Sequence, residues 1–190
     1  MRKQVATDSH VCRWWLAYTF DNPVRKFFHQ PAKILGPYIE NGMRVMDVGC
    51  GMGFFSIGMA KMVGDEGKVF SIDLQQKMLE VTLRRAKRAG LAERISPHRC
   101  QPDNLGLKET VDFILTFWMV HEVKNKTSFF RELHSNLAPG GKIITAEPKM
   151  HVSPEAFKKT LEIAQSTGLR VCGQPAIRLS LTALLERISR

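Results

Sequence analysis

The sequence predicts an α/β protein with a doubly wound, mostly parallel sheet and helices on both of its faces. Short runs of β-branched and other apolar residues alternate along the chain with segments of helical periodicity. A glycine-rich turn joins the first such strand to the first such helix, and the second strand ends in an acid, Asp73. Alternation of this kind places a sheet between two layers of helices.

The expected elements follow one another in a regular order. Strands are expected at 43–48, 68–72, 94–99, 111–116 and 141–147, and helices at 54–62, 75–89, 125–137 and 154–167. A short irregular piece precedes the fourth strand, and the chain ends in a strand-rich tail. Gly90 ends the second helix, residues 136–141 with their Pro-Gly-Gly form a turn, and Ser153-Pro154 begins the last helix with a capping residue and a proline.

Length and composition are those of one compact domain. The chain has 190 residues, of which 44% are hydrophobic and 24% charged, which is ordinary globular usage. We expect a single domain over 1–190, with an N-terminal helical lid over 1–41 and an α/β core over 42–190. No apolar run approaches the roughly 18 residues of a membrane span, and the N-terminus lacks the apolar core of a signal peptide. We therefore expect a cytoplasmic protein without a membrane span.

The charge is strongly basic, with 28 Lys and Arg against 18 Asp and Glu and a net charge of +10. Such an excess suggests an acidic partner, such as nucleic acid. Four of the basic residues, Arg84, Arg85, Lys87 and Arg88, crowd one face of a helix whose other face is apolar, which is typical of a solvated outer face. Because no recognition motif accompanies the charge, a small molecule is favoured over nucleic acid as the partner.

The four cysteines, Cys12, Cys50, Cys100 and Cys172, are spread singly along the chain. They lack the Cys-x-x-Cys spacing of a zinc site, so we expect free thiols in a reducing compartment and no metal site. In an alternative interpretation, Cys12, Cys50 and Cys100 converge on a thiophilic substrate, because soft acceptors favour sulfur ligands.

Residues 44–56, Arg-Val-Met-Asp-Val-Gly-Cys-Gly-Met-Gly-Phe-Phe-Ser, predict a strand, a nucleotide-binding loop and a helix. Gly49, Gly51 and Gly53 remove side chains where the backbone turns sharply and approaches a ligand, and the helix N-terminus offers N–H groups. Asp73 follows at a spacing of about 20 residues, at which a carboxylate meets a ribose diol. The third glycine comes one place too early for the NAD pattern Gly-x-Gly-x-x-Gly.

The motif Asp47-Val-Gly-Cys-Gly-Met-Gly53 resembles the first motif of the class I S-adenosylmethionine (SAM)-dependent methyltransferases, acid-x-Gly-x-Gly-x-Gly. Asp73 and the segments 111–121 and 137–148 are similar to later parts of that family. The similarity is closest in character to the ubiquinone and menaquinone methyltransferases. It implies a Rossmann-like SAM methyltransferase fold and an enzyme that uses SAM and releases S-adenosylhomocysteine.

The resemblance assigns candidate roles in cofactor binding. The three glycines and Cys50 would form the loop beside the methionine part of SAM. Asp47 would hold the methionine amino group, directly or through water, or else brace the loop through backbone N–H groups. Asp73 would accept the ribose hydroxyls, and Leu74 and Met78 would pack on the adenine ring or fill the core.

The adenine contact after the third strand has two assignments. The family commonly has an acid there, and Gln101, followed by Pro102, occupies that place in this chain. A glutamine carbonyl can still accept a hydrogen bond from the adenine amino group, and Asp103 is the competing assignment if the register slips by two. Phe117, at the end of the fourth strand, completes the predicted cofactor site.

No catalytic residue is assigned, and His121 and Glu147 are the candidates for a general base. The sulfonium of SAM is already an activated leaving group, so alignment of the acceptor with the methyl group supplies much of the catalysis without a base. The resemblance favours a structural role for a histidine at this place.

The sequence therefore predicts a SAM-dependent methyltransferase that acts by in-line displacement on a small-molecule acceptor. The aromatic, partly basic segments 10–20 and 27–29 would cover the methyl group and bind an apolar or flat acceptor. The alternatives are an RNA or protein methyltransferase that uses the basic surface, a SAM- or nucleotide-binding regulator without transfer chemistry, and an NAD-linked enzyme. The oligomeric state is not predicted.

Overall fold

The computed structural model of the chain describes residues 28–188, and residues 1–27 and 189–190 lie outside the described part. Its centre is a seven-stranded sheet in the order β3-β2-β1-β4-β5-β7-β6. The strands are β1 (Arg44–Val48), β2 (Lys68–Asp73), β3 (Ile95–Arg99), β4 (Val111–Phe117), β5 (Leu137–Pro148), β6 (Leu169–Gly173) and β7 (Ser180–Arg187). Strands β1 to β5 are parallel, and β7 pairs antiparallel with β5 and β6. The predicted mostly parallel sheet is confirmed.

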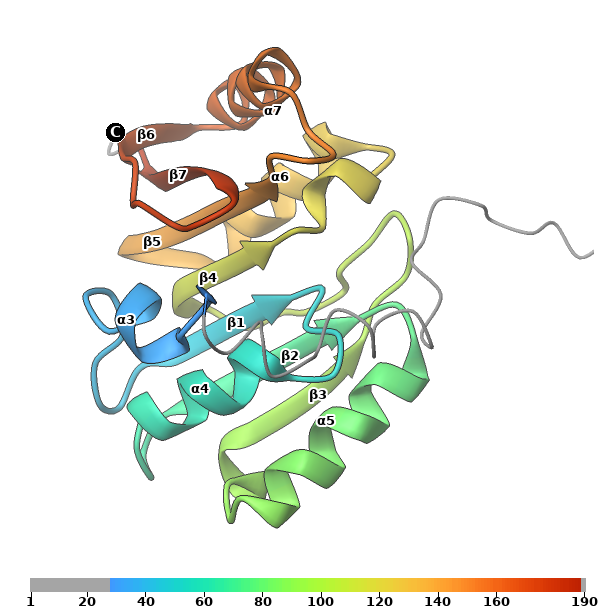
Figure 1. Cartoon of the computed structure of the whole chain (residues 1–190), viewed down its shortest axis with the longest axis vertical. Helices are drawn as coiled ribbons and strands as arrows, with labels where there is room; N and C mark the ends of the chain where they lie inside the picture. Colours follow the sequence, from blue (N-terminus) through green and yellow to red (C-terminus); the bar gives the residue numbers. More distant parts are fainter. Residues whose placement is uncertain (1–27, 189–190) are drawn as a thin grey trace, which may run out of the picture.

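Helices cover both faces of this sheet (Figure 1). They are α3 (Pro31–Leu35), α4 (Phe54–Met62), α5 (Gln76–Arg88), α6 (Lys126–Asn136) and α7 (Pro154–Ser166), with the short 3-10 turns η1 (Ala92–Arg94) and η2 (Val120–Glu122). One apolar layer packs α3, α4 and α5 against the sheet, and a second packs α6 and α7 against its other face. This is the doubly wound arrangement that the sequence predicts.

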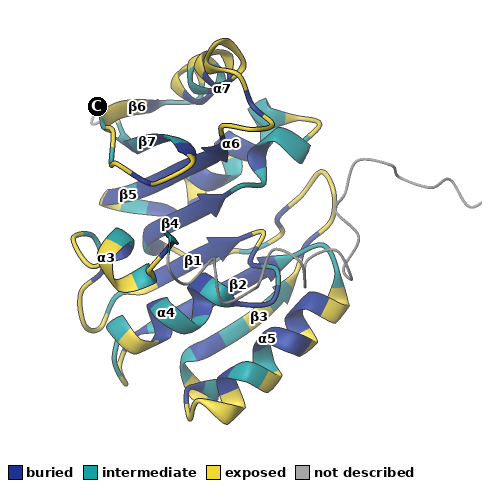
Figure 2. Ribbon diagram, in the orientation of Figure 1, coloured by how far each residue is buried: buried dark blue, intermediate teal, exposed yellow. Residues whose placement is uncertain are grey.

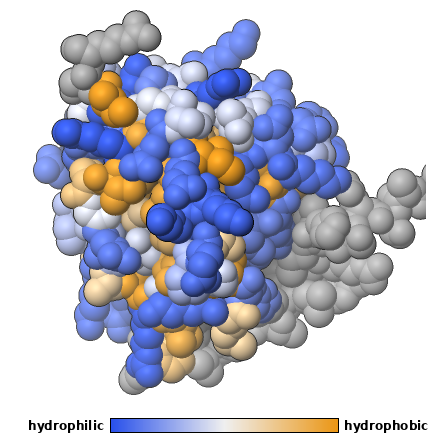
Figure 3. Space-filling view, turned by 90° about the horizontal axis from the view of Figure 1, so that it is seen from above, coloured by the Kyte–Doolittle hydropathy of each residue, from blue (hydrophilic) through white to orange (hydrophobic). Residues whose placement is uncertain are grey.

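Burial explains why the strands read as continuous apolar runs. Val45 of β1 belongs to the layer of α3, α4 and α5, whereas its neighbour Met46 belongs to the layer of α6 and α7, and neither side chain is exposed. Strands covered on both faces need apolar residues at every position. Figure 2 shows these buried strands between helices whose outer faces are exposed. Seen from above, over α7, the surface is mainly hydrophilic with hydrophobic side chains between the hydrophilic ones (Figure 3).

The expected helix ends are largely confirmed. Ser153 caps α7 by accepting a hydrogen bond from the Ala156 N–H at 3.2 Å, and Gly90 follows α5 with a φ of +67°. One boundary differs, because β5 begins at Leu137 and not at 141. Leu137 already pairs with Val111 of β4, and the pairing register shifts before Lys142. The Pro-Gly-Gly segment is therefore an irregularity within a strand and not a turn before it.

The described part of the N-terminal segment packs against α4. The backbone and ring of Pro31 approach Gly58 so closely that a Cβ there would lie 2.4 Å from the Pro31 Cβ. Leu35 and Ile39 are buried in the same apolar layer. Residues 1–27, which include Cys12 and the aromatic stretch 10–20, lie outside the described residues, so the N-terminal lid stays a prediction. Within 28–188, no helix has the length and apolar character needed to cross a membrane.

Candidate active site at the carboxyl edge of the sheet

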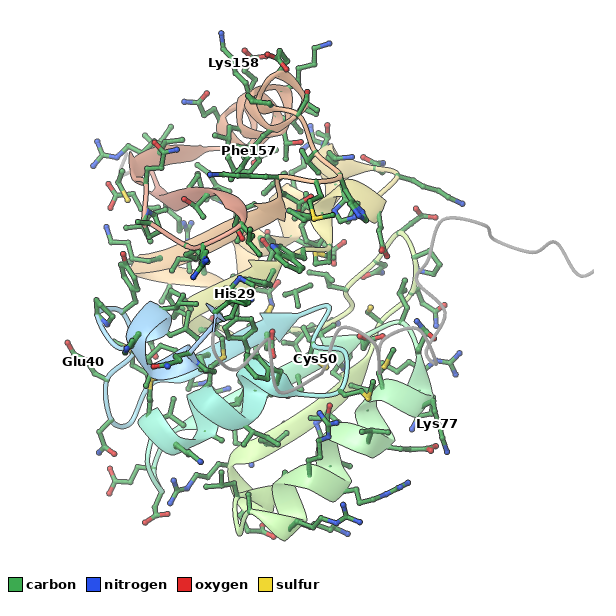
Figure 4. The ribbon with its side chains drawn as sticks, viewed as in Figure 1. His29, Glu40, Cys50, Lys77, Phe157 and Lys158 are labelled. Atoms are coloured by element: carbon green, nitrogen blue, oxygen red, sulfur yellow. The ribbon has the colours of Figure 1, made fainter. Side chains whose placement is uncertain are left out.

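A cavity of about 210 Å³, here called the edge cavity, opens at the carboxyl ends of β1 to β4. Doubly wound sheets bind their ligands at this edge. Its lining residues are Val48, Gly49, Gly51, Asp73, Leu74, Gln75, Met78, Cys100, Gln101, Pro102, Leu105, Trp118, Met119, Glu122, Val123, Lys124 and Phe129. Cys50, labelled in Figure 4, marks the loop between β1 and α4 beside the cavity.

Three glycines with positive φ shape the β1–α4 loop. The φ angles of Gly49, Gly51 and Gly53 are +71°, +53° and +78°. The Gly49 N–H donates to the Ile72 carbonyl at 2.9 Å, which fastens the loop to β2. A Cβ at Gly51 would meet no atom within 4 Å, whereas one at Gly53 would lie 2.6 Å from the Thr82 Cγ2. Gly51 therefore leaves space for a ligand, and Gly53 lets α4 pack closely on α5.

Asp73 connects the glycine loop to the cavity. Its Oδ2 accepts the Gly51 N–H and its Oδ1 accepts the Gln75 N–H, each at 2.9 Å. Burial raises the pKa of Asp73 because it penalises the charged carboxylate, and these N–H groups partly offset that effect. Asp73 lines the cavity, and a carboxylate oxygen can accept more than one hydrogen bond. A diol that donates two hydrogen bonds would stabilise the charged form.

Seven of the residues predicted for the cofactor site line the edge cavity, namely Gly49, Gly51, Asp73, Leu74, Met78, Gln101 and Pro102. A tight turn positions the last two, because the Gln101 N–H donates to the Asn104 carbonyl at 2.9 Å. Asp103 lies exposed at the tip of that turn and does not line the edge cavity.

The other predicted residues, Asp47, Cys50, Gly53 and Phe117, do not line the edge cavity. Gly53 instead lines a groove between α3, α4 and α5. Asp47 is only 2% exposed, and its Oδ2 accepts the Ser56 hydroxyl at 2.6 Å, so it joins the end of β1 to the start of α4. Phe117 is buried on the α4 face of the sheet, where its ring centroid lies 4.5 Å from that of Phe55.

The wall opposite Asp73 was not predicted as part of the cofactor site. It consists of residues that follow β4, in η2 and at the start of α6, which are Trp118, Met119, Glu122, Val123, Lys124 and Phe129. The wall and the glycine loop touch, because a Cβ at Gly49 would lie 2.8 Å from the Met119 Cγ. Cys100 and Leu105 also line the cavity. Neither was predicted as a cofactor contact, and Cys100 was named only in the alternative of a thiophilic substrate.

Glu147, near the end of β5, holds the backbone of this opposite wall in place. It is 1% exposed, and its carboxylate accepts the backbone N–H groups of Met119, Val120 and His121 at 2.9–3.1 Å. The His121 Nδ1 lies 2.6 Å from the Glu147 Oε2, and this hydrogen bond raises the pKa of His121. Neither side chain lines the edge cavity. The geometry thus gives both a positioning role in η2.

The described cysteines near the cavity are protonated thiols. Burial, with the nearby charge of Asp73, raises the pKa of Cys50 and raises that of Cys100 to about 11. Thiolates are the form that binds soft acceptors. In the part of the chain that the structure describes, no three His, Cys, Asp or Glu side chains are grouped so that they could hold a metal ion. Cys12 lies outside that part.

A larger and more open groove of about 780 Å³ runs between α3, α4 and α5. Its lining includes Phe54, Ile57 and Met62, and its charged residues are Lys61 and Arg85. Since none of its lining residues within 28–188 has a carboxylate to accept a diol, the edge cavity is the better candidate for a nucleoside.

Glu147→Gln is expected to lower the pKa of His121, because the amide removes the negative partner of the imidazolium. Since the folded pKa is raised, the pairing stabilises the fold below the unfolded histidine pKa of about 6.5 and loses this effect as the pH rises through the folded pKa. An NMR titration of the His121 ring measures the change. Glu162→Gln, on the exposed side of α7, is the control, and equal pKa values in all three proteins would contradict the pairing.

Comparisons with known proteins identify the family of the chain. Residues 39–178 match a family model described as a methyltransferase domain. The demethylmenaquinone methyltransferase of Geobacillus kaustophilus is 29% identical over 114 residues, which are 57% of this chain and 47% of that protein. The enzyme of the same name from Listeria monocytogenes is 30% identical over 120 residues, 59% of this chain and 48% of that protein. The chain spans about half the length of these curated relatives.

Solved structures resemble the chain over nearly its whole length. A SAM-dependent methyltransferase from Aquifex aeolicus superimposes with a TM-score of 0.83 at 25% identity, covering 94% of this chain and all of that one. A putative SAM-dependent methyltransferase from Methanococcus maripaludis shares the fold at a TM-score of 0.77 and 16% identity, covering 95% and 96% of the two chains. With the glycine loop, Asp73 and the matched methyltransferase domain together, the chain belongs to the class I SAM-dependent methyltransferases.

Proposed function

We propose that the edge cavity binds SAM and that the chain transfers the methyl group by in-line displacement to a small, flat and apolar acceptor. One observation carries this proposal, the hydrogen bond from Gly51 to Asp73, which presents a carboxylate and an open glycine to the same cavity. A loop without a ligand would need neither the empty space beside Gly51 nor an acid turned toward it.

The lining residues match the parts of SAM. The ribose hydroxyls would donate to Asp73, the adenine ring would lie between Leu74 and Met78 with its amino group toward Gln101, and the methionine part would follow the glycine loop. The cavity of about 210 Å³ is smaller than the roughly 300–1,000 Å³ of pockets that enclose a whole ligand. It therefore suits the nucleoside, with the methionine end toward the mouth.

When bound, SAM supplies a methyl group activated by its sulfonium. The chain's own residues bind and orient: Asp73 fixes the ribose, and Glu147 and His121 hold the wall that carries Met119. In the transfer, a nucleophilic atom of the acceptor would form a bond to the methyl carbon as the carbon–sulfur bond breaks. S-adenosylhomocysteine would be released, and the acceptor's proton would pass to solvent. Alignment of the two reactants is the main contribution of such a site.

The acceptor class is supported by the relatives and by the cavity. The curated relatives are named for demethylmenaquinone, which makes a quinol-type acceptor the first choice for this chain. The wall opposite Asp73 includes Trp118, Met119 and Phe129, which suit an apolar molecule. The cytoplasmic location stays a prediction.

Asp73→Ala is expected to weaken SAM binding by about 1.5–3 kcal/mol, the value of hydrogen bonds to a charged group. Calorimetric titration of the folded variant measures the loss. Asp103→Ala is the matched control, since it removes an exposed acid from the same edge. Unchanged affinity in Asp73→Ala would refute the ribose assignment, and a loss confined to Asp103→Ala would move the nucleoside contact to that residue.

Gly51→Ala tests the space in the loop. Both Gly51 and Gly90 have positive φ and open surroundings, so alanine at either place adds backbone strain of order 1 kcal/mol without a clash. Only the Gly51 methyl would enter the edge cavity. We expect similar losses of thermal stability in both variants, measured by calorimetry, and a tenfold or greater loss of SAM affinity (about 1.4 kcal/mol) in Gly51→Ala alone. Equal SAM affinities would place the ligand elsewhere.

Transfer itself is tested with SAM that carries a labelled methyl group. The purified chain is incubated separately with reduced naphthoquinols, with RNA and with protein, and incorporated label is counted. Label in the quinols supports the proposal, whereas label confined to RNA or protein assigns the acceptor to a macromolecule. Binding of SAM without label in any pool indicates a regulator.

A further inference from the structure

Trp118 closes the edge cavity in a backbone conformation that side chains rarely adopt. Its φ is +59°, and among residues 28–188 the other non-glycine residue with positive φ is Leu179, at +61°. Trp118 directly follows β4 and Leu179 directly precedes β7, so both lie at the carboxyl edge of the sheet. Such conformations persist only where neighbouring contacts enforce them, and they collect at functional sites.

Several contacts hold Trp118 in place. Its indole Nε1–H donates to the Ser180 hydroxyl oxygen at 2.9 Å, and its backbone N–H donates to the Ala146 carbonyl at 2.7 Å. The ring of His29 meets the indole edge to face, with 5.1 Å between the ring centroids. The Phe117 ring stacks on the indole at a centroid distance of 5.3 Å, so an acceptor would meet the part of Trp118 that Phe117 leaves uncovered. The side chain and the backbone of Trp118 are therefore both fixed.

The contacts continue into a buried network behind the indole. The Ser180 hydroxyl donates to the Arg178 carbonyl at 3.4 Å, and the His29 Nε2 lies 2.9 Å from the same carbonyl oxygen. Ser180 is 5% exposed and His29 2% exposed. Figure 4 shows His29 between α3 and the middle strands of the sheet. His29, which precedes α3, and Ser180, at the start of β7, thus both contact Trp118, which lines the edge cavity.

Two exposed apolar side chains lie at the edge of the sheet beside this network. Leu179 is 45% exposed and Met150 is 86% exposed. The Lys149 N–H donates to the Leu179 carbonyl at 3.0 Å, so the loop after β5 and the loop before β7 meet here. Single exposed apolar residues are ordinary. Leu179 and Met150 lie at the same edge of the sheet as Trp118, and neither lines the edge cavity itself.

We propose that Trp118 is the platform on which a flat aromatic acceptor binds, and that Ser180 and His29 are positioning residues that set the orientation of its indole. This inference rests on the proposed function, since it requires SAM in the edge cavity. Aromatic rings favour an indole as a neighbour, and an indole held in one orientation costs little conformational entropy when it binds. The acceptor would then lie against the wall that faces the cofactor.

The test uses the full-length chain, labelled with ¹⁵N and first titrated with S-adenosylhomocysteine. The loaded protein is then titrated with 1,4-naphthoquinol under reducing conditions, while the indole N–H signals of its three tryptophans are followed. Trp118→Phe identifies the Trp118 signal by its loss. We expect a saturable shift of this signal with naphthoquinol.

Two variants remove the same hydrogen bond from opposite sides. Trp118→Phe keeps an aromatic ring, and Ser180→Ala keeps the indole. Each should raise the naphthoquinol dissociation constant by roughly two- to tenfold, the range for one lost hydrogen bond. Ser180→Ala, whose residue does not line the edge cavity, should leave S-adenosylhomocysteine affinity within about twofold. The double variant should bind naphthoquinol no worse than Trp118→Phe alone, because the two residues act through one contact.

Thr182→Ala is the matched control. The Thr182 hydroxyl donates to the Pro175 carbonyl in the same β6–β7 loop but has no described bond to Trp118. Thr182→Ala should leave naphthoquinol affinity unchanged. A loss of naphthoquinol affinity equal to that of Ser180→Ala would mean that these residues support the loop as a whole and do not orient Trp118. Absence of a saturable Trp118 shift in protein that binds S-adenosylhomocysteine would overturn the acceptor platform alone. Failure to bind S-adenosylhomocysteine would overturn the proposed function and this inference with it.

Discussion

The hydrogen bond between the Gly51 N–H and the Asp73 carboxylate is the contact on which the candidate site depends. It ties the loop after β1 to the end of β2, where the two strands are already paired through Val48 and Ile72. A buried carboxylate is costly unless hydrogen bonds satisfy it, and two backbone N–H groups supply part of this requirement. A ribose diol would supply the rest. The loop is therefore held in the shape that the ligand needs before the ligand arrives.

A second buried acid has a different task on the opposite wall. Glu147 gathers three backbone N–H groups and the His121 ring, and it lies behind the wall and not in it. Asp73 ends β2 and Glu147 lies near the end of β5, with β1 and β4 between these strands, yet only Asp73 faces the cavity. Exposure to the cavity thus distinguishes the carboxylate proposed to bind the ligand from one that orders the chain. The same distinction applies to Asp47, which joins β1 to α4 through Ser56.

The fold and half of the site could be predicted because their signals are local. Glycine spacing, strand runs and helix caps are each recognised within a few residues. The strand runs and the caps give the fold, and the glycine spacing with Asp73 gives the part of the site that follows β1 and β2. The wall of Met119, Val123 and Phe129 has no such signal, because it meets the glycine loop only through the pairing of β4 with β1. Phe117 was predicted in the cofactor site, but it belongs with Phe113 and Leu115 to the layer of α4. These three residues alternate along β4 with a period of two, which is visible in the sequence and places Phe117 in the core. The start of β5 at Leu137 depended on pairing with Val111, which no local pattern shows.

Calorimetric titration of the purified chain with SAM, S-adenosylhomocysteine and NAD tests the central claim most directly. The glycine loop fixed by Asp73 predicts micromolar binding of both adenosyl ligands at a stoichiometry of one, and no binding of NAD. Binding of NAD in place of SAM, or binding of neither by a folded sample, would contradict the assignment of the edge cavity to SAM.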